Sequence, residues 1–202
     1  MASVTPNPLH IQDVPNAAAF ERWRKANHKK ADELWLKIHK KASGLPTVTY
    51  AEALDVALCW GWIDGLKKTY DENSFLQRFT PRKLKSIWSQ INRDHVDRLC
   101  AAGRITPRGL QHVDAAKSDG RWQAAYAPAS RNVMPEDLMV AIQRSPKARA
   151  FFATLNSVNR HALSFRLQRI KTATVRAKKI DAFVAMLAKG QVLHAGTAKP
   201  NK

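Results

Sequence analysis

The chain has 202 residues, of which 45% are hydrophobic and 25% are charged, and these normal globular values exclude wholesale disorder. No stretch approaches the roughly 18 consecutive apolar residues that a membrane span needs. The net charge of +18 is far from normal, and it favours an acidic partner such as nucleic acid, an anionic lipid headgroup or an acidic protein.

The first elements of the chain are a helix and a strand. Asn16 is a typical helix N-cap, and Phe20 and Trp23 fall on one face of the helix that follows it. Residues 34–39 have the period of two of a half-buried strand, with the even-numbered residues facing the core and Trp35 facing away from it.

A second helix and a hairpin are expected next. Thr49 and Glu52 form a capping box that begins the helix, and Gly61 supplies the left-handed residue that ends it. Residues 62–79 are strand-like around a polar turn, which predicts a hairpin that pairs with the earlier strand. Further along, Ser86 is expected to cap a helix that carries Ile91.

Composition changes near residue 127. Residues 1–126 hold all six Trp and all three Tyr, with 20 basic against 13 acidic residues and a net charge of +7. Residues 127–202 hold neither, with 14 basic against 3 acidic residues and a net charge of +11. Helical spacing at 158–171 and 175–189 completes the prediction: an α+β fold with a small antiparallel sheet packed with helices in a domain at 1–126, followed by an all-helical basic region at 127–202.

Signatures of known catalytic or metal chemistry are not found in the sequence. The seven histidines show no HExxH or other paired spacing, and the patterns GxSxG, GxxxxGK[ST] and GxGxxG do not occur. We therefore predict no metal, no cofactor and no catalytic residue. An unrecognised enzyme that uses Asp64, or Cys59 with a distant histidine, remains a third alternative.

The two cysteines and the first residues bear on the compartment. Cys59 and Cys100 lack a CxxC spacing and lie in helical apolar patterns, which favours structural thiols over a disulfide framework. The first residues lack the charged segment and apolar run of a secretory signal. We therefore expect a soluble cytoplasmic protein.

A basic loop beside aromatic residues is the strongest signal of a ligand site. It contains Arg78, Arg82, Lys83, Lys85 and Arg93. If a helix begins at Ser86, its free N–H groups and the nearby guanidinium groups point at the same place, which favours an anion site; the alternative is a basic segment with Trp88 in the core. Asp64 is expected to hold one of the basic side chains. The residues that we expect to bind the ligand are Trp62, Asp64, Arg78, Arg82, Lys85, Trp88 and Asn92.

Residues 144–180 contain ten Lys and Arg and no acidic residue. Such a run on helices is typical of binding to phosphate backbones, although a solvated face is the alternative. Because no base-reading signature is found, the binding would tolerate many sequences. The candidates for nucleic-acid contacts are Arg160, Arg166, Arg169, Lys171, Arg176, Lys178 and Lys179.

A family resemblance rests on the segments ELWLKIHKK, VTYAEALDVALCWGWIDG, RFTPRKLKSIWSQINR, LCAAGRITPRGLQHVDAAKSDGRW and TVRAKKI. Over roughly residues 20–190 the chain resembles the bacteriocin-protection (YdeI/OmpD-associated) family. The resemblance implies stress tolerance, namely tolerance of bacteriocins and cationic antimicrobial peptides, and supplies no catalytic residues. Because a protein of charge +18 repels cationic peptides, any protection would be indirect.

Three hypotheses follow. The first is a non-enzymatic cytoplasmic binding protein of this family, whose anionic small ligand or acidic protein partner binds at the basic loop. The second is a sequence-tolerant nucleic-acid-binding protein that uses the basic C-terminal helices, and the third is the unrecognised enzyme. The sequence leaves the ligand and the oligomeric state open.

Overall fold

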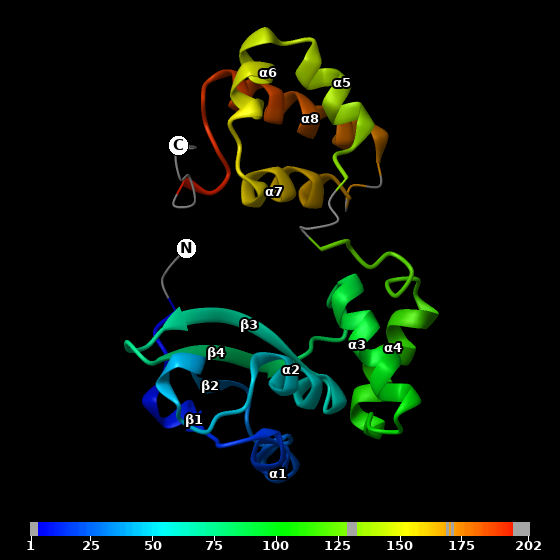
Figure 1. Ribbon diagram of the computed structural model, residues 1–202. Coiled ribbons are helices and arrows are strands. Elements are labelled where there is room, and N and C mark those ends of the chain that lie inside the picture. The colour runs from blue at the N-terminus through cyan, green and yellow to red at the C-terminus, as the bar shows by residue number, and fades with distance from the viewer. Residues whose placement is uncertain (1–3, 129–132, 169, 171, 196–202) are drawn as a thin grey trace. The chain divides into compact units, whose positions relative to one another are not determined.

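The chain folds into two units, residues 1–125 and 126–202 (Figure 1). The computed structural model describes residues 4–128, 133–168, 170 and 172–195. Within these ranges no helix is both long and apolar enough to cross a lipid bilayer. The α+β class is confirmed, and every regular element described in the second unit is a helix.

A four-stranded sheet organises the first unit. Its strands are β1 (Ile11–Asp13), β2 (Leu34–His39), β3 (Trp62–Thr69) and β4 (Ser74–Pro81), in the order β1-β2-β4-β3. The hairpin of β3 and β4 is confirmed, and β4 pairs antiparallel with β2. The sheet is mixed rather than wholly antiparallel, because β1 pairs parallel with β2. At three residues, β1 is too short to produce a readable alternation.

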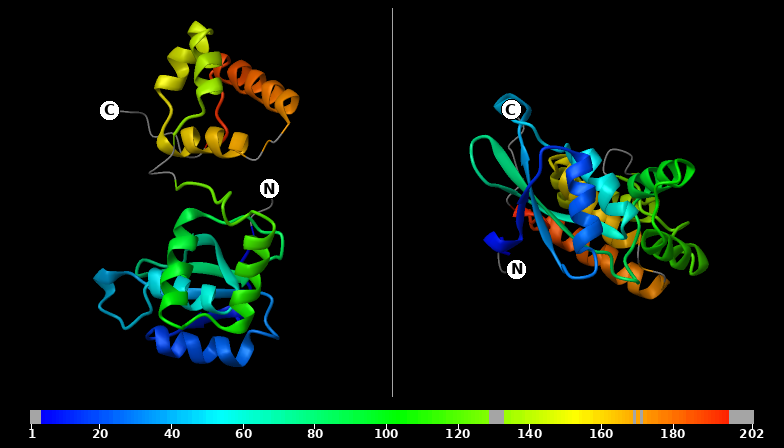
Figure 2. Two further views of the ribbon diagram at one scale, coloured as in Figure 1. Left: turned by 90° about the vertical axis from the view of Figure 1, so that its right-hand side faces the viewer. Right: turned by 90° about the horizontal axis from the view of Figure 1, so that it is seen from below.

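Four helices accompany the sheet. They are α1 (Ala17–Asn27), α2 (Tyr50–Cys59), α3 (Gln90–Ala101) and α4 (Pro107–Ser118), with short 3-10 turns at Pro8–His10 and Lys41–Ser43. The caps at Asn16 and Thr49 form as predicted. Residues of α1 and α2 form one hydrophobic core with β2, β3 and β4. A second core joins α2 to α3 and α4, which lie side by side (Figures 1 and 2).

Two predicted details of the first unit are wrong. Helix α3 begins at Gln90 and is capped by Ser89, not by Ser86, because the backbone N–H of Ser86 instead donates to the carbonyl oxygen of Lys83 in a turn. Ile91 lies on this helix as predicted, and its side chain is exposed. Trp35 is fully buried although the alternation of its strand directs it away from the core.

The second unit contains four helices among its described residues. They are α5 (Glu136–Gln143), α6 (Pro146–Ala153), α7 (Ser157–Gln168) and α8 (Ala173–Ala188). Leu138, Phe152, Leu163 and Phe183, one from each helix, are buried in a common core. The unit therefore has a hydrophobic core of its own.

Candidate anion-binding site

Gly61 is the residue at which α2, β3 and α4 meet. It has a left-handed backbone (φ +71°), and a Cβ atom here would lie 2.7 Å from Cδ2 of His112 and 3.2 Å from the carbonyl oxygen of Arg108. The Gly61 carbonyl accepts a hydrogen bond from the backbone N–H of Arg82 at 2.9 Å. Glycine suits this position by conformation and by size, and it brings three basic residues to one junction.

The N-terminus of α4 is fixed against the C-terminus of α2. Thr106 caps α4, and its backbone N–H and its hydroxyl both donate to the carbonyl oxygen of Cys59, at 3.1 and 2.6 Å. A Cβ atom at Gly109 would lie 2.4 Å from the same oxygen, so only glycine permits this approach. Since Arg108 and His112 are four residues apart on α4, this contact sets the position of both.

Arg24, on α1, places a positive charge in the interior. Its side chain is fully buried, and its guanidinium carbon lies 3.3 Å from the centroid of the Trp62 ring and 5.5 Å from that of Trp23. Within the described part of the chain, none of its guanidinium nitrogens has a hydrogen-bond partner. Burial, and secondly the charge of Arg108, lower the pKa of Arg24 to about 9, so it is still protonated at neutral pH. The charge is stacked on an aromatic ring but is not neutralised.

Arg82 lies over a second tryptophan. Its guanidinium carbon is 3.6 Å from the centroid of the Trp88 ring, and Nη1 donates to the carbonyl oxygen of Ile87 at 2.9 Å. Trp88 in turn packs edge-on against Trp122, with ring centroids 4.9 Å apart. Arg82 is buried, so this second charge is also largely removed from water.

Two half-buried residues of α4, Arg108 and His112, lie beside these charges. Burial lowers the pKa of His112, and the charges of Arg82, Arg108 and Arg121 lower it further. Nδ1 of His112 and Nε of Arg108 are buried and have no hydrogen-bond partner among the residues that the structure describes. Both side chains are partly open to solvent.

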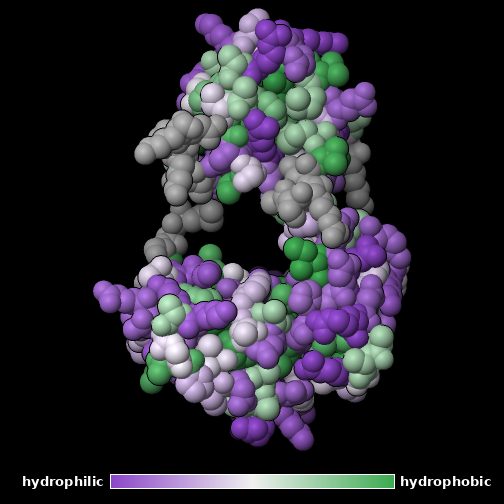
Figure 3. All heavy atoms as spheres, in the orientation of Figure 1, coloured by the Kyte–Doolittle hydropathy of each residue, from purple (hydrophilic) through white to green (hydrophobic). Residues whose placement is uncertain are grey.

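We call Arg24, Arg82, Arg108 and His112 the arginine cluster. The charged groups that shift the pKa values of Arg24 and His112 are all positive. The guanidinium group of Arg24, Nε of Arg108 and Nδ1 of His112 are buried without a hydrogen-bond partner among the described residues, and such nitrogens beside positive charge are the chemistry of a site for an anion. On the face drawn in Figure 3, hydrophilic residues cover most of the α3–α4 part of the first unit.

The structure brings three of the predicted pocket residues to this cluster. Trp62 lies against the guanidinium group of Arg24, and Trp88 lies against that of Arg82. The indole nitrogens of Trp62 and Trp88 are buried without a hydrogen-bond partner in the described ranges. The predicted combination of tryptophan and arginine is therefore present, although part of it comes from residues that were not predicted.

Two predicted pocket residues on the hairpin have other partners. Nε of Arg78 donates to Glu33 at 2.8 Å, and this ion pair occupies its guanidinium group. The hydroxyl of Tyr50 donates to Asp64 at 2.7 Å. The hydrogen bond that Asp64 accepts thus comes from α2, and not from the basic loop as predicted.

Lys85 and Asn92 are separated by the later start of α3. Lys85 is exposed in the turn that precedes the helix. The backbone N–H of Asn92 donates to the hydroxyl of Ser89 at 3.1 Å and so belongs to the cap. The predicted meeting of Lys85 with a helix N-terminus does not occur.

Arg24, Arg108 and His112 were not predicted. One signal for Arg108 was available, because the tripeptide Thr-Pro-Arg occurs twice, at 80–82 and 106–108, and each copy supplies one arginine of the cluster. For Arg24 the helical pattern gave no such signal, since it follows Trp23 directly.

Two C-terminal basic residues hold the second unit together. Arg160 donates to the carbonyl oxygen of Ala153, the last residue of α6, and to that of Leu155 just after it, both at 3.0 Å. Arg176 pairs with Asp137 and donates to the Leu167 carbonyl oxygen at 2.8 Å.

The other C-terminal candidates differ in their surroundings. The ammonium group of Lys179 lies 5.1 Å from the centroid of the Phe183 ring, and Lys178 and Arg166 are exposed. Arg169 and Lys171 lie outside the described residues.

The remaining candidates for reactive chemistry are the Cys59 thiol and side chains that could bind a metal ion. Cys59 is fully buried, and burial raises its pKa to about 11, so the thiolate is scarce at neutral pH. Among the described residues, no group of three or more His, Cys, Asp or Glu side chains is placed to hold a metal ion.

Two family models match different parts of the chain. A domain of unknown function, DUF8412, matches residues 12–112, and the family described as bacteriocin-protection, YdeI or OmpD-associated, matches residues 132–190. The predicted resemblance to the second family is thereby confirmed, but the match lies in the second unit, whereas most of the motifs that carried the resemblance fall in the first match. No curated protein and no solved structure gave a match.

Proposed function

The chain belongs to the DUF8412 family, and we propose that it is a non-enzymatic binding protein that holds a small oxyanion at the arginine cluster of that domain. The observation that carries the proposal is the fully buried guanidinium group of Arg24, which has no hydrogen-bond acceptor among the described residues. A buried charge without a partner destabilises a fold, and a bound anion removes that penalty.

The burial of Arg24 also favours a small ligand over a polymer. A phosphate backbone follows exposed side chains, and it cannot reach a group that is fully removed from solvent. In this proposal a small anion enters beside Arg108 and His112, which are partly exposed. The C-terminal alternative for nucleic acid has less support, because Arg160 and Arg176 are held by contacts within their own unit.

In this proposal the biological role is indirect and the compartment is the cytoplasm. The match of the second unit to the bacteriocin-protection family supports a role in tolerance of antimicrobial peptides. The net charge of +18 opposes direct capture of cationic peptides. Binding of an anionic metabolite inside the cell is compatible with both facts.

The test is a titration of the full chain with inorganic phosphate, pyrophosphate and sulfate at constant ionic strength, with chloride as the control. Because Trp62 and Trp88 touch the cluster, binding is expected to change tryptophan fluorescence and to release or absorb heat in calorimetry. We expect Arg108→Gln to weaken the binding about tenfold or more, since hydrogen bonds to charged groups are worth about 1.5–3 kcal/mol.

Arg104→Gln is the matched control, because Arg104 is exposed in the loop that precedes α4. It is expected to bind like the unaltered protein. Equal binding by the two variants would contradict the proposal, as would a response to all three oxyanions no greater than that to chloride.

A further inference from the structure

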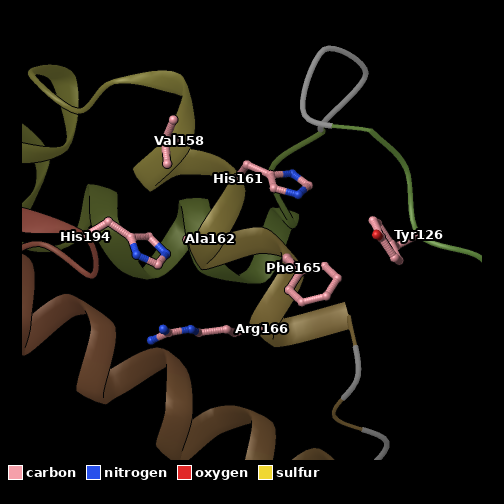
Figure 4. Close-up of a pocket in the computed structure, with 7 residues that line it drawn as sticks. All are labelled: Tyr126, Val158, His161, Ala162, Phe165, Arg166 and His194. Carbon is pink, nitrogen blue, oxygen red and sulfur yellow. The ribbon is translucent and has the colours of Figure 1, made fainter. Parts of the chain in front are cut away.

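The second unit contains a pocket on α7 that is separate from the arginine cluster (Figure 4). Its volume is about 450 Å³, which lies within the range of small-molecule sites. Five of its lining residues come from α7, and Tyr126 and His194 complete it. The pocket falls largely within the segment that matches the bacteriocin-protection family.

One wall of the pocket is aromatic. The rings of Tyr126 and Phe165 meet edge-on, with centroids 4.9 Å apart, and the ring of His161 lies 5.8 Å from that of Phe165. Val158, Ala162 and Phe165 recur at helical spacing, so α7 presents an apolar stripe here in addition to the one that faces the core. A flat apolar group fits against such a wall.

The position of His194 is fixed by a buried amide. The side chain of Asn159 is buried, its Oδ1 accepts from the backbone N–H of His194 at 3.0 Å, and its Nδ2 donates to the carbonyl oxygen of His194 at 3.4 Å. These two bonds hold the residue against α7. In Figure 4 the side chains of His194 and Arg166 lie on one side of α7, and those of His161 and Phe165 on the other.

The polar groups of the pocket favour an anion. No acidic residue lines it, and Arg166 has no ion pair or hydrogen bond among the described residues. Nδ1 of His161 is buried and has no partner in the described part of the chain. A guanidinium group that is free to form two parallel hydrogen bonds matches the geometry of a carboxylate.

We propose that this pocket binds an organic carboxylate with an aromatic body. The ligand lies across the face of α7, with its carboxylate held by Arg166 beside His194 and its body against Phe165. The site does not depend on the arginine cluster, which lies in the other unit.

The experiment is calorimetry on the full chain with 2-naphthoate, its neutral analogue 2-naphthamide, and acetate. Naphthoate is expected to bind, and naphthamide and acetate to bind about tenfold or more weakly, because the first lacks the charge and the second lacks the body. Arg166→Gln is expected to weaken naphthoate binding about tenfold, and Phe165→Ala to weaken it as well. Lys178→Gln, at an exposed position of α8, is the matched control and should change nothing.

Three results would overturn the proposal. Equal affinity for naphthoate and naphthamide would mean that no carboxylate is recognised. Loss of naphthoate binding in Arg108→Gln but not in Arg166→Gln would assign the binding to the arginine cluster instead. Displacement of naphthoate by a single-stranded oligonucleotide, with the same loss of oligonucleotide binding in Arg166→Gln, would mean that this face of α7 is a nucleic-acid surface.

Discussion

The guanidinium carbon of Arg24 lies 3.3 Å from the centroid of the Trp62 ring, and both side chains are fully buried. A cation–π contact of this kind contributes about 2 kcal/mol when it is desolvated. Burial of an unpaired charge costs several kcal/mol more than an apolar side chain of similar size. The ring therefore offsets only part of the cost, and a bound anion would offset the rest.

Replacement of Arg24 by methionine should stabilise the ligand-free protein. Methionine has a similar length and no charge to desolvate, so the free energy of unfolding is expected to rise by about 1–4 kcal/mol. Urea denaturation with and without inorganic phosphate measures the change, and phosphate should no longer stabilise the variant. Arg22→Met, at an exposed position of the same helix, is the control. A large loss of stability in Arg24→Met would instead identify Arg24 as a structural cation.

The lowered pKa of Arg24 also predicts how stability changes with pH. In the folded state the pKa is about 9, whereas an arginine in the unfolded chain stays protonated to much higher pH. Above about pH 9 the unfolded state therefore binds more protons, and the contribution of Arg24 to stability rises with pH. We expect the stability of the unaltered protein relative to Arg24→Met to rise by about 1.4 kcal/mol per pH unit above that value. A difference that stays constant between about pH 8 and about pH 10 would contradict the shift.

Gly61→Ala should be more damaging than the same substitution at Gly44, which is also left-handed. The left-handed conformation costs about 1–2 kcal/mol for any L side chain, and the contact of 2.7 Å with His112 adds strain. Gly44→Ala is the matched control, because Gly44 has a similar φ of +68° and no atom within 4 Å of the added Cβ. Thermal denaturation should show a larger decrease in melting temperature for Gly61→Ala than for Gly44→Ala. Similar decreases would mean that the close approach of α4 to Gly61 adds no steric strain.

Local signals in the sequence predicted the helices and strands better than the residues of the arginine cluster. The capping box at Thr49, the strand at 34–39 and the hairpin follow from neighbouring residues, and the structure contains all three. The start of α3 was missed because Ser86 and Ser89 are equally good caps, and in the structure Ser89 caps the helix while Ser86 lies in the turn before it. Local pattern cannot resolve such a choice.

The arginine cluster could be predicted only in part, because it is assembled over long range. Arg82 and Arg108 come from two segments that meet at Gly61, whereas Arg24 comes from α1, and nothing in the pattern of α1 marks Arg24 as buried. A basic residue in a helix is ordinarily exposed, and only tertiary packing, which the local sequence does not reveal, buries Arg24.

The two cysteines should react very differently with an alkylating reagent. Burial raises the pKa of Cys59 to about 11, which leaves about one thiolate in a thousand at pH 8, while Cys100 is exposed. Iodoacetamide is expected to label Cys100 in the folded protein and Cys59 only after denaturation, as peptide mass mapping would measure. Labelling of both at the same rate in folded protein would indicate that the end of α2 opens, and would revive the hypothesis of a reactive Cys59.

Asp55 joins α2 to α3 through a pH-sensitive ion pair. Its carboxylate lies 2.6 Å from Nδ1 of His95 and 2.7 Å from Nη2 of Arg98. Burial of the carboxyl group raises its pKa, but the hydrogen bonds from Arg98 and His95 outweigh this effect, so the pKa of Asp55 is lowered overall. Because the folded-state pKa is the lower one, the contribution to stability is complete above the ordinary carboxyl pKa and is lost as the pH falls through the folded-state value.

Asp55→Asn is therefore expected to cost about 1–2 kcal/mol near neutral pH, since hydrogen bonds to a charged group are the strong ones. The difference from the unaltered protein should shrink as the pH falls below the ordinary range of a carboxyl group, because both proteins then carry a neutral side chain at this position. Asp97→Asn, at an exposed position of α3, serves as the control and should cost little at any pH. Urea denaturation at neutral and at acidic pH separates the outcomes. A cost for Asp55→Asn that does not depend on pH would assign the role of Asp55 to packing, and the link between α2 and α3 would then not depend on its charge.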